Sequence, residues 1–315
     1  MFNNKYINEK KLNEIDDPYI VPYNGIYAIC DENKKYIELI EFSDCFCGVC
    51  WSYHHYGKSS LIKKSKIIGT SIRHIIKIGI EKLKLQSSIK AAGIESVLLD
   101  CKKKEVSITY SGLGGGGIGA TMCRALANGV IRYTITDYGG KKQAKGTIFL
   151  PIRFRVLIAI DDTDSSEKGA TWTLTYNIAK KISCNEFIFL SQSLVQLYPV
   201  PEKTQNCMST ILEFGCIDQK SKNILVNSFK ELLLKYTMSN NTGMLIYSGF
   251  SIPKLLKDYS FKCRSQRLNK EDALNIAKKC NIDIILNGNG IIGAMASFFW
   301  YSNPLKSSDP KFLKS

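Results

Sequence analysis

Long apolar runs are missing from the sequence. No stretch approaches about 18 uncharged apolar residues, and the first residues contain no apolar segment typical of a signal peptide. We therefore expect no membrane span and a cytoplasmic protein.

Carboxylates are also scarce, with 28 Asp and Glu residues against 43 Lys and Arg residues, which gives a net charge of +15. This charge favours a polyanionic partner such as a nucleotide, tRNA or another RNA, although a general preference for lysine explains it equally well.

The eleven cysteines indicate reduced thiols, because no export signal accompanies them. Hydrophobic residues make up 44% of the 315 residues, enough for one large or two ordinary domains. We predict an α+β (mixed α/β) protein with a seam near Pro151. The expected parts are an N-terminal α+β domain at 1–150, an α/β domain at 151–303 and a loose tail at 304–315.

The most informative stretch is an apolar run followed by carboxylates. Residues 156–160 predict a buried strand, and Asp161, Asp162 and Asp164 follow at its C-terminal end. Closely spaced acids repel one another unless they share a cation, and oxygen ligands on a short loop suit Mg²⁺ together with nucleotide phosphates. The alternative is a solvated acidic turn, since short motifs also match by chance.

Hydrophobic periodicity predicts most of the remaining elements. Isoleucines at 72, 75, 76 and 80 have helical spacing, so we predict an amphipathic helix at 72–83 with His74 on its polar side. In the C-terminal half we predict strands at 187–190, 210–214, 244–247 and 282–286 and helices at 174–182, 224–236 and 291–300.

Three segments of the C-terminal half carry a resemblance to a known family. Residues 160–166 read IDDTDSS with Gly169 beyond them, residues 194–206 read LVQLYPVPEKTQN, and residues 287–296 read NGNGIIGAMA. In this order they resemble the kinase-type domain of archaeal tRNA-isoleucine agmatidine synthetases. The chain as a whole is most similar to the methanogenesis marker 11 family of methane-forming archaea, which is related to that domain.

The resemblance implies binding of ATP and Mg²⁺, and we expect phosphoryl or nucleotidyl transfer, of a ligase or kinase type, to an unidentified substrate. Asp161, Asp162 and Asp164 would form the metal-binding catalytic centre, with Lys203 as their electrostatic partner. Backbone N–H groups around Gly288 and Gly290, at a helix N-terminus, would cradle a phosphate. The further candidate nucleotide contacts are Thr163, Ser165, Gly169, Thr171, Thr173 and Asn206.

A glycine run at 112–119 matches G-x-G-x-x-G twice and lies between an expected strand and an expected helix. This order is typical of a dinucleotide site, but the preceding residues alternate polar and apolar, unlike a buried parallel strand. A phosphate-binding or closely packed loop is the favoured alternative, with Arg124 and Arg132 near enough for an anion. The candidate cofactor contacts in the run are Gly114, Gly116 and Gly119.

Cys45, Cys47, Cys50 and His54 form the remaining motif, in which Cys47 and Cys50 have C-x-x-C spacing. Such residues bind zinc or an iron–sulfur cluster, form a redox pair, or remain reduced thiols in a strand.

Two alternatives to the ATP-using enzyme therefore stay open. One is a maturation protein that handles metal or sulfur. The other is a non-catalytic RNA- or protein-binding factor, favoured by the charge and by Trp172, which lies near the position where the synthetases have a threonine.

Overall fold

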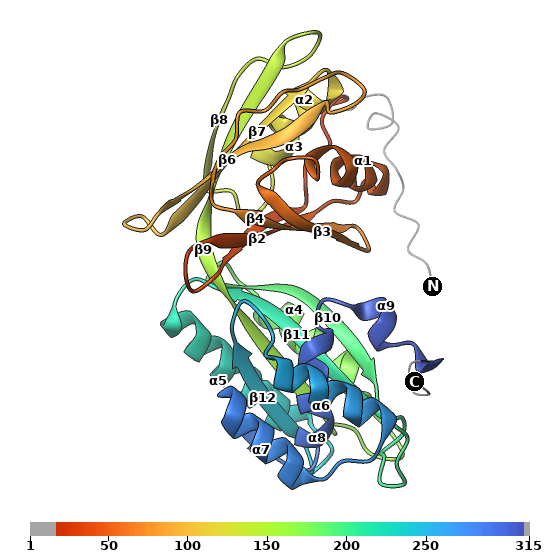
Figure 1. The fold of residues 1–315 in the computed structure, drawn as a ribbon. Helices are drawn as coiled ribbons and strands as arrows, with labels where there is room; N and C mark the ends of the chain where they lie inside the picture. The colour runs from red at the N-terminus through yellow and green to blue at the C-terminus, as the bar shows by residue number, and fades with distance from the viewer. Residues whose placement is uncertain (1–16, 312–315) are drawn as a thin grey trace, which may run out of the picture. The chain divides into compact units, whose positions relative to one another are not determined.

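The computed structural model describes residues 17–311 and divides into two compact units (Figure 1). Among the described residues, the N-terminal unit consists of residues 17–27 and 39–151, and the C-terminal unit consists of residues 28–38 and 152–311. Residues 28–38 thus belong with the second unit, whereas the sequence placed them in the first. The parts of the expected N-terminal domain and tail at 1–16 and 312–315 lie outside the described residues.

The N-terminal unit is built on antiparallel strands. Its strands and helices are β2 (Tyr36–Phe42, which begins in the other unit), α1 (Phe46–Tyr56), β3 (Ile62–Ile68), β4 (Ser71–Lys77), β5 (Gly79–Ile80), β6 (Ala92–Asp100), β7 (Glu105–Leu113), α2 (Gly115–Ala120), α3 (Met122–Ala125), β8 (Arg132–Ile135) and the first part of β9 (Gln143–Asp161). In sequence order β3 pairs with β4, β5 with β6, β6 with β7, and both β7 and β8 pair with β9.

The predicted helix at 72–83 is wrong, because this segment forms β4 and β5. β4 pairs antiparallel with β3 and is buried on both faces over most of its length. Isoleucine favours strands because its branched Cβ packs well on a pleated surface. A spacing of four residues joins Ile72 and Ile76 on one face of a strand as well as on one face of a helix, so the periodicity alone did not distinguish them.

His74 is 1% exposed and does not lie on a polar surface as predicted. Its Nδ1 is 2.8 Å from Oγ of Ser65. Burial lowers the pKa of His74 to about 4, with nearby Glu41 raising this pKa and nearby Arg124 lowering it. The folded unit therefore holds this imidazole neutral at pH values where an exposed histidine is protonated.

The C-terminal unit has an antiparallel sheet in the order β10–β11–β9–β12–β13. Its strands are the second part of β9, β10 (Phe187–Gln196), β11 (Met208–Cys216), β12 (Gly243–Ser248) and β13 (Asp283–Asn287), and β1 (Gly25–Cys30) adds a short parallel pairing to β9. Its helices are α4 (Thr171–Ile182), α5 (Gln219–Tyr236), α6 (Lys254–Ser265), α7 (Lys270–Cys280), α8 (Ile291–Ser297), the 3₁₀ turn η2 (Phe298–Trp300) and α9 (Pro304–Ser307).

Two helical layers bury the second part of β9 on both faces. Val156, Ile158 and Ile160 pack with the buried residues of α4 and α5. Leu157 and Ala159 pack with those of α6, α7 and α8. Because successive side chains of a strand point to opposite faces, an unbroken apolar run suits a strand covered on both sides. The mixed α/β class and the buried strand at 156–160 are confirmed, although the neighbouring strands are antiparallel.

The C-terminal segment is not loose where it is described. Ser307 is fully buried in α9, and its hydroxyl donates to the carbonyl of Leu194 at 2.6 Å. The guanidinium of Arg264 donates to the carbonyl of Asp309 at 2.8 Å. Within residues 17–311, no helix combines the length and apolar character needed to cross a bilayer.

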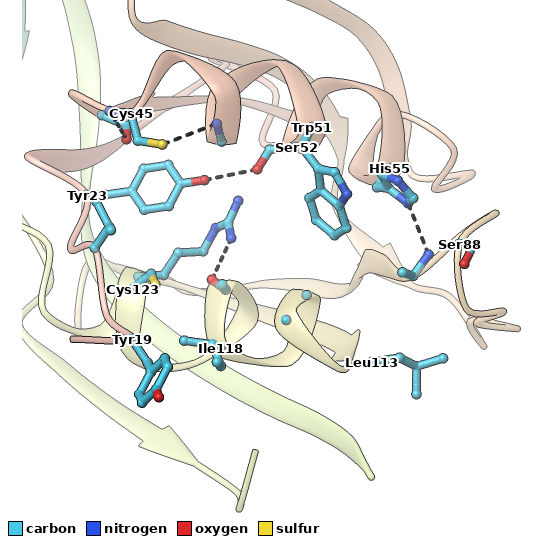
Figure 2. A pocket seen from close by; sticks show the side chains of 18 residues that line it. Tyr19, Tyr23, Cys45, Trp51, Ser52, His55, Ser88, Leu113, Ile118 and Cys123 are labelled. Carbon is cyan, nitrogen blue, oxygen red and sulfur yellow. Dashed lines mark hydrogen bonds between the residues drawn. The ribbon is translucent and has the colours of Figure 1, made fainter. Parts of the chain in front are cut away.

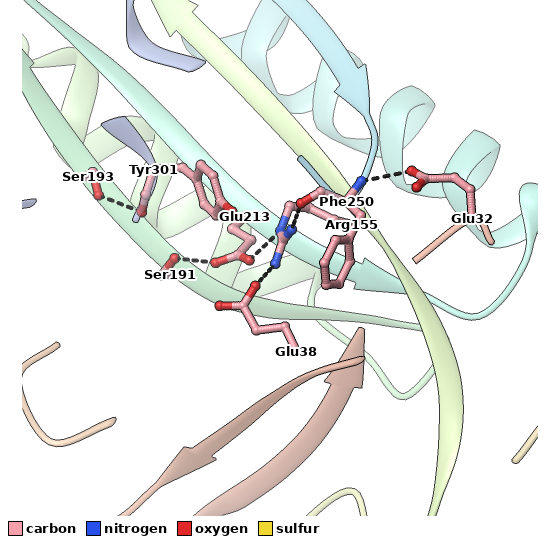
Figure 3. Close-up of polar contacts among 8 residues, drawn as sticks. All are labelled: Glu32, Glu38, Arg155, Ser191, Ser193, Glu213, Phe250 and Tyr301. Atoms are coloured by element: carbon pink, nitrogen blue, oxygen red, sulfur yellow. Dashed lines mark hydrogen bonds and ion pairs between the residues drawn. The ribbon is translucent and has the colours of Figure 1, made fainter. Parts of the chain in front are cut away.

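A buried ion network joins several parts of the C-terminal unit (Figure 3). Arg155 of β9 donates through Nε to Glu213 of β11 at 2.8 Å and also forms an ion pair with Glu38. It donates further to the carbonyl of Phe250 at 2.6 Å, and its guanidinium lies 4.8 Å from the ring centre of Tyr301. These contacts attach residues 28–38 and the C-terminal segment to the central strand.

We predict that Arg155→Met destabilises the protein by about 3–5 kcal/mol, because it leaves the buried carboxylate of Glu213 without its cation. The matched control is Arg267→Met, which removes an ion pair with Glu202 whose side chains are 65% and 57% exposed and which should cost about 0–1 kcal/mol. Urea unfolding measures both. Equal costs would mean that the network around Arg155 contributes no more than a surface pair.

We also predict a pH-dependent stability that arises from His74. Its pKa is lower in the folded state, so between about pH 6.5 and 4 the unfolded chain binds more protons and stability falls as the pH falls. Lowering the pH from about 7.5 to 5 should remove about 2 kcal/mol through this residue. Urea unfolding should show a flatter pH dependence in His74→Gln, whereas the exposed control His54→Gln should keep the wild-type dependence. An unchanged dependence in His74→Gln contradicts the prediction.

Candidate functional site

The acidic motif lies where β9 ends. Asp161 is the last residue of the strand, and Asp162 has a left-handed backbone with φ of 55°, which turns the chain sharply. The N–H of Asp162 donates to Oδ1 of Asp161 at 2.9 Å. Oγ1 of Thr242 donates to the carbonyl of Asp162 at 3.0 Å and so fixes the turn from β12.

Both carboxylates line a cleft of about 620 Å³ within the C-terminal unit. Lys203 and Asn206 of the second motif segment line it, as do Asn289 and Gly293 of the third. Other polar contacts support this arrangement, since Oγ1 of Thr204 donates to Asp164 at 2.8 Å. The three segments that resemble the synthetase domain therefore meet at one cleft.

Close packing explains the glycines of the third segment. A Cβ atom on Gly293 would overlap Oδ2 of Asp161, and one on Gly290 would lie 2.6 Å from the carbonyl oxygen of Asp161. The N–H of Gly288 donates to the carbonyl of Thr242 at 3.1 Å, and that of Gly290 to the carbonyl of Asn241 at 2.8 Å. The N–H groups of Gly288 and Gly290 themselves are therefore already bonded, and phosphate binding by N–H groups around them stays a prediction. The glycines allow α8 to lie directly against the end of β9.

The pKa values of Asp161 and Asp162 are both raised in this cleft. Burial, and then the neighbouring carboxylate of Asp162, raises the pKa of Asp161 well above its ordinary value. Burial, and then Asp164, raises the pKa of Asp162 to about 6. Two carboxylates that repel each other in a partly desolvated cleft favour a bound cation.

Magnesium fits this pair, but not as a three-carboxylate site. Asp164 bonds to Thr204 and is not among the cleft-lining residues. In residues 17–311 no three His, Cys, Asp or Glu side chains are grouped to hold a metal, so Asp164 does not complete the ligand set as predicted. Mg²⁺ ordinarily binds through one or two carboxylates, water and substrate phosphates, which matches Asp161 and Asp162.

Cationic side chains line the same cleft. Besides the predicted Lys203, Arg267 and Lys270 come from the segment around the start of α7, which the sequence did not identify as a helix. Nζ of Lys270 donates to the carbonyl of Asn287 at 2.5 Å, and Arg267 pairs with Glu202. No local pattern marks these two residues, because only the packing of α6 and α7 brings them to the cleft.

The other predicted contacts around the acidic motif hold its loop in shape. The N–H and Oγ1 of Thr163 donate to Oγ1 of Thr171 at 3.2 and 3.1 Å, and both threonines are buried. Thr173 donates to the carbonyl of Ala170 at 2.9 Å. Ser165 bonds within its own turn, and Gly169 has φ of 91°. None of these five residues is among those lining the cleft, and direct nucleotide contact by them stays a prediction.

The Cys/His motif does not form the predicted metal centre. Cys45 caps α1, with Sγ accepting from the N–H of Gly48 at 3.4 Å. Cys47 and His54 are exposed on α1, and Cys50 lies one turn after Cys47 on the same helix. These four side chains belong to no group of three His, Cys, Asp or Glu residues in the described part of the chain that could hold a metal ion. The alternative of thiols in a strand is also wrong, since the segment is helical.

The glycine run does not have the context of a dinucleotide site. Its preceding strand β7 pairs antiparallel with β6 and β9, and the run itself forms the short helix α2. A dinucleotide fingerprint requires a parallel βαβ unit. Arg124 forms a buried pair with Glu41, and Arg132 pairs with Glu105, so both expected anion contacts already have carboxylate partners.

Comparisons with known proteins find similarity between the C-terminal unit and TiaS proteins. The family model of the TiaS TCKD domain matches residues 157–224. The tRNA 2-agmatinylcytidine synthetase TiaS of Thermococcus sibiricus is 32% identical over 155 residues, which are 47% of this chain and 35% of that protein. The solved complex of TiaS with tRNA and ATP is 24% identical with a TM-score of 0.41, over 46% of this chain and 36% of that one. Residues 157–224 are therefore similar to the TCKD domain of TiaS. The chain spans about a third of the length of these synthetases.

A second relative covers nearly the whole chain. The uncharacterized protein MJ0921 of Methanocaldococcus jannaschii is 36% identical over 282 residues, which are 88% of this chain and 93% of that protein. The chain belongs to the same family as MJ0921. The similarity thus includes the N-terminal unit, which the match to the TCKD domain does not reach.

We predict that Gly293→Ala destabilises the protein by about 1–3 kcal/mol, because the added methyl group would overlap the Asp161 carboxylate and lie 2.7 Å from Leu197. The control Gly115→Ala should be neutral or stabilising, since a Cβ there meets no atom within 4 Å. Urea unfolding measures the effects.

The same contact can be tested by a double-mutant cycle. In an Asp161→Ala background the cost of Gly293→Ala should fall by at least about 0.5 kcal/mol, because the carboxylate that it would overlap is gone. Additive costs would show that Asp161 and Gly293 are not in contact.

Proposed function

We propose that the chain is an ATP- and Mg²⁺-dependent enzyme that transfers a phosphoryl or nucleotidyl group to an unidentified substrate. One observation carries the proposal: Asp161, Asp162 and the cationic side chains of Lys203 and Lys270 share one cleft. A cleft with adjacent carboxylates and cations suits a metal–polyphosphate complex, which presents a cation to the acids and anionic oxygens to the lysines.

The residues that line the cleft have different roles in binding the nucleotide and stabilising charge. Asp161 and Asp162 would hold Mg²⁺, which when bound neutralises phosphate charge and orients the polyphosphate. Lys203 would stabilise the charge that develops on the transferred group, and Lys270 and Arg267 would bind the remaining phosphates. Asn206 and Asn289 supply amide groups for further hydrogen bonds to the nucleotide. Gly293 gives α8 the close approach that sets the position of Asp161.

The relatives support a more specific version of the proposal. TiaS is named as a synthetase of a modified cytidine in tRNA, and the net charge of +15 suits a polyanionic partner. We therefore propose tRNA or another RNA as a candidate partner of this chain, acting in the cytoplasm. Membership of the methanogenesis marker 11 family, which the sequence as a whole resembles, stays a proposal.

Incubation of the full chain with ATP and Mg²⁺, with total RNA as acceptor, tests the proposal. We predict that ATP is converted to ADP if a phosphoryl group is transferred, or to pyrophosphate and an AMP group that is attached to the acceptor or later released from it if a nucleotidyl group is transferred. Asp162→Asn should lower turnover by at least about 100-fold, because it removes one of two charges that bind the metal. The matched control Asp258→Asn changes an exposed carboxylate on α6 outside the cleft and should leave turnover unchanged. Equal turnover in the two variants would overturn the assignment.

A further inference from the structure

A second cavity lies within the N-terminal unit, between α1 and the α2–α3 segment (Figure 2). Its volume is about 560 Å³, within the range of small-molecule sites. Two motifs that the proposed function does not use meet there, since Cys45 lines the cavity beside Gly116 and Gly119 of the glycine run. Neither motif forms the metal or dinucleotide site that its spacing suggested.

Aromatic rings form much of the cavity wall. The ring of Trp51 stacks on His55 with centres 4.0 Å apart and planes 19° apart. Tyr23 also lines the cavity, but the guanidinium of Arg124 lies 4.6 Å from the centre of its ring and covers it. Tyr19, which also lines the cavity, is 82% exposed. Such rings offer flat apolar faces to a ligand, and they accept other planar rings best.

The glycines keep the opposite wall free of side chains. A Cβ atom on Gly116 would lie 2.9 Å from the ring of Trp51, so only glycine allows α2 to approach this ring. A Cβ atom on Gly119 would meet only Arg124, at 3.8 Å, an ordinary contact distance. The space beside Gly119 is therefore available for a ligand, and a larger side chain at this position would enter it.

The charge in the cavity wall is already neutralised. Arg124 is 1% exposed and is the one Lys or Arg among the described residues that line the cavity. Its Nε and Nη2 donate to the two oxygens of Glu41 at 2.8 and 3.0 Å, and its Nη1 donates to Tyr56 and to the carbonyl of Gly119. A phosphate here would lose its hydration without gaining an unpaired cation, which is unfavourable.

His55 supplies a neutral donor. Its Nδ1 accepts from the N–H of Ala91 at 3.1 Å, so the neutral ring carries its proton on Nε2. Burial, and then the neighbouring Lys58, lowers the pKa of His55 and so favours this neutral form. An acceptor nitrogen on a heteroaromatic ring would match the Nε2–H group.

We propose that this cavity binds an uncharged, planar heteroaromatic ring of the size of a purine, held by stacking on Trp51. The ring is either that of a free nucleoside or an unpaired base of single-stranded RNA. The site lies within the N-terminal unit and is independent of the proposed nucleotide cleft. In this proposal the glycine run has a role, because its residues line the cavity without side chains and so leave room for the bound ring.

Calorimetric titration of the full chain tests the proposal, with adenosine, guanosine and a single-stranded hexa-adenylate RNA as probes. We expect at least one probe to bind. Gly119→Leu, which fills the cavity, and Trp51→Leu, which removes the stacking ring, should each weaken that binding at least about tenfold. The control Leu126→Ala, at an exposed residue outside the cavity, should bind as the wild type does. Asp162→Asn should also bind normally, which separates this site from the acidic cleft.

The probes distinguish the two sources of the ring. Similar affinity for a nucleoside and for the RNA indicates a free ligand, and binding of the RNA alone indicates a base presented by RNA. Nucleoside binding should be insensitive to salt up to about 0.5 M because no phosphate contact is involved. The proposal is overturned if no probe binds, or if both cavity variants fold, as judged by circular dichroism, and bind every probe like the wild type.

Discussion

The second part of β9 is the constraint on which the candidate site depends. This strand is buried on both faces, between the layer of α4 and α5 and the layer of α6 to α8. Its direction is therefore fixed, and it delivers Asp161 against α8, where Gly293 leaves room for the carboxylate. Burial and neighbouring carboxylates raise the pKa values of Asp161 and Asp162, so the charged forms of both side chains are costly at this position. Tight packing around a strained polar site is typical of functional centres.

Elements with one dominant packing pattern could be predicted from the sequence. The run 156–160 is continuous because both faces of its strand are covered, and α5 shows a clear apolar stripe because only one of its faces is buried. β4 was mistaken for a helix because its isoleucine spacing fits both periods. The helices α1, α6 and α7 were missed, although α6 and α7 each have an apolar face and α7 begins with a capping box of Asn269 and Asp272.

The candidate site was predicted in part. The apolar run followed by carboxylates led to Asp161 and Asp162, and resemblance to a known domain led to Lys203 and Asn206. All four residues line one cleft. Arg267 and Lys270 reach the cleft only through tertiary packing, so local sequence could not reveal them. The sequence also could not show why Gly290 lacks a side chain. A glycine in a motif leaves space beside the backbone, but the motif does not tell whether a ligand or another segment of the chain fills that space. Here the carbonyl of Asp161 fills it.

Crystals of the full chain grown with ATP and Mn²⁺ in place of Mg²⁺ would test the central claim most directly, by anomalous scattering. The account predicts a manganese peak bonded to carboxylate oxygens of Asp161 and Asp162, with nucleotide phosphates between that ion and Lys203. An ordered nucleotide bound elsewhere on the chain, or a manganese ion that contacts neither aspartate, would contradict it.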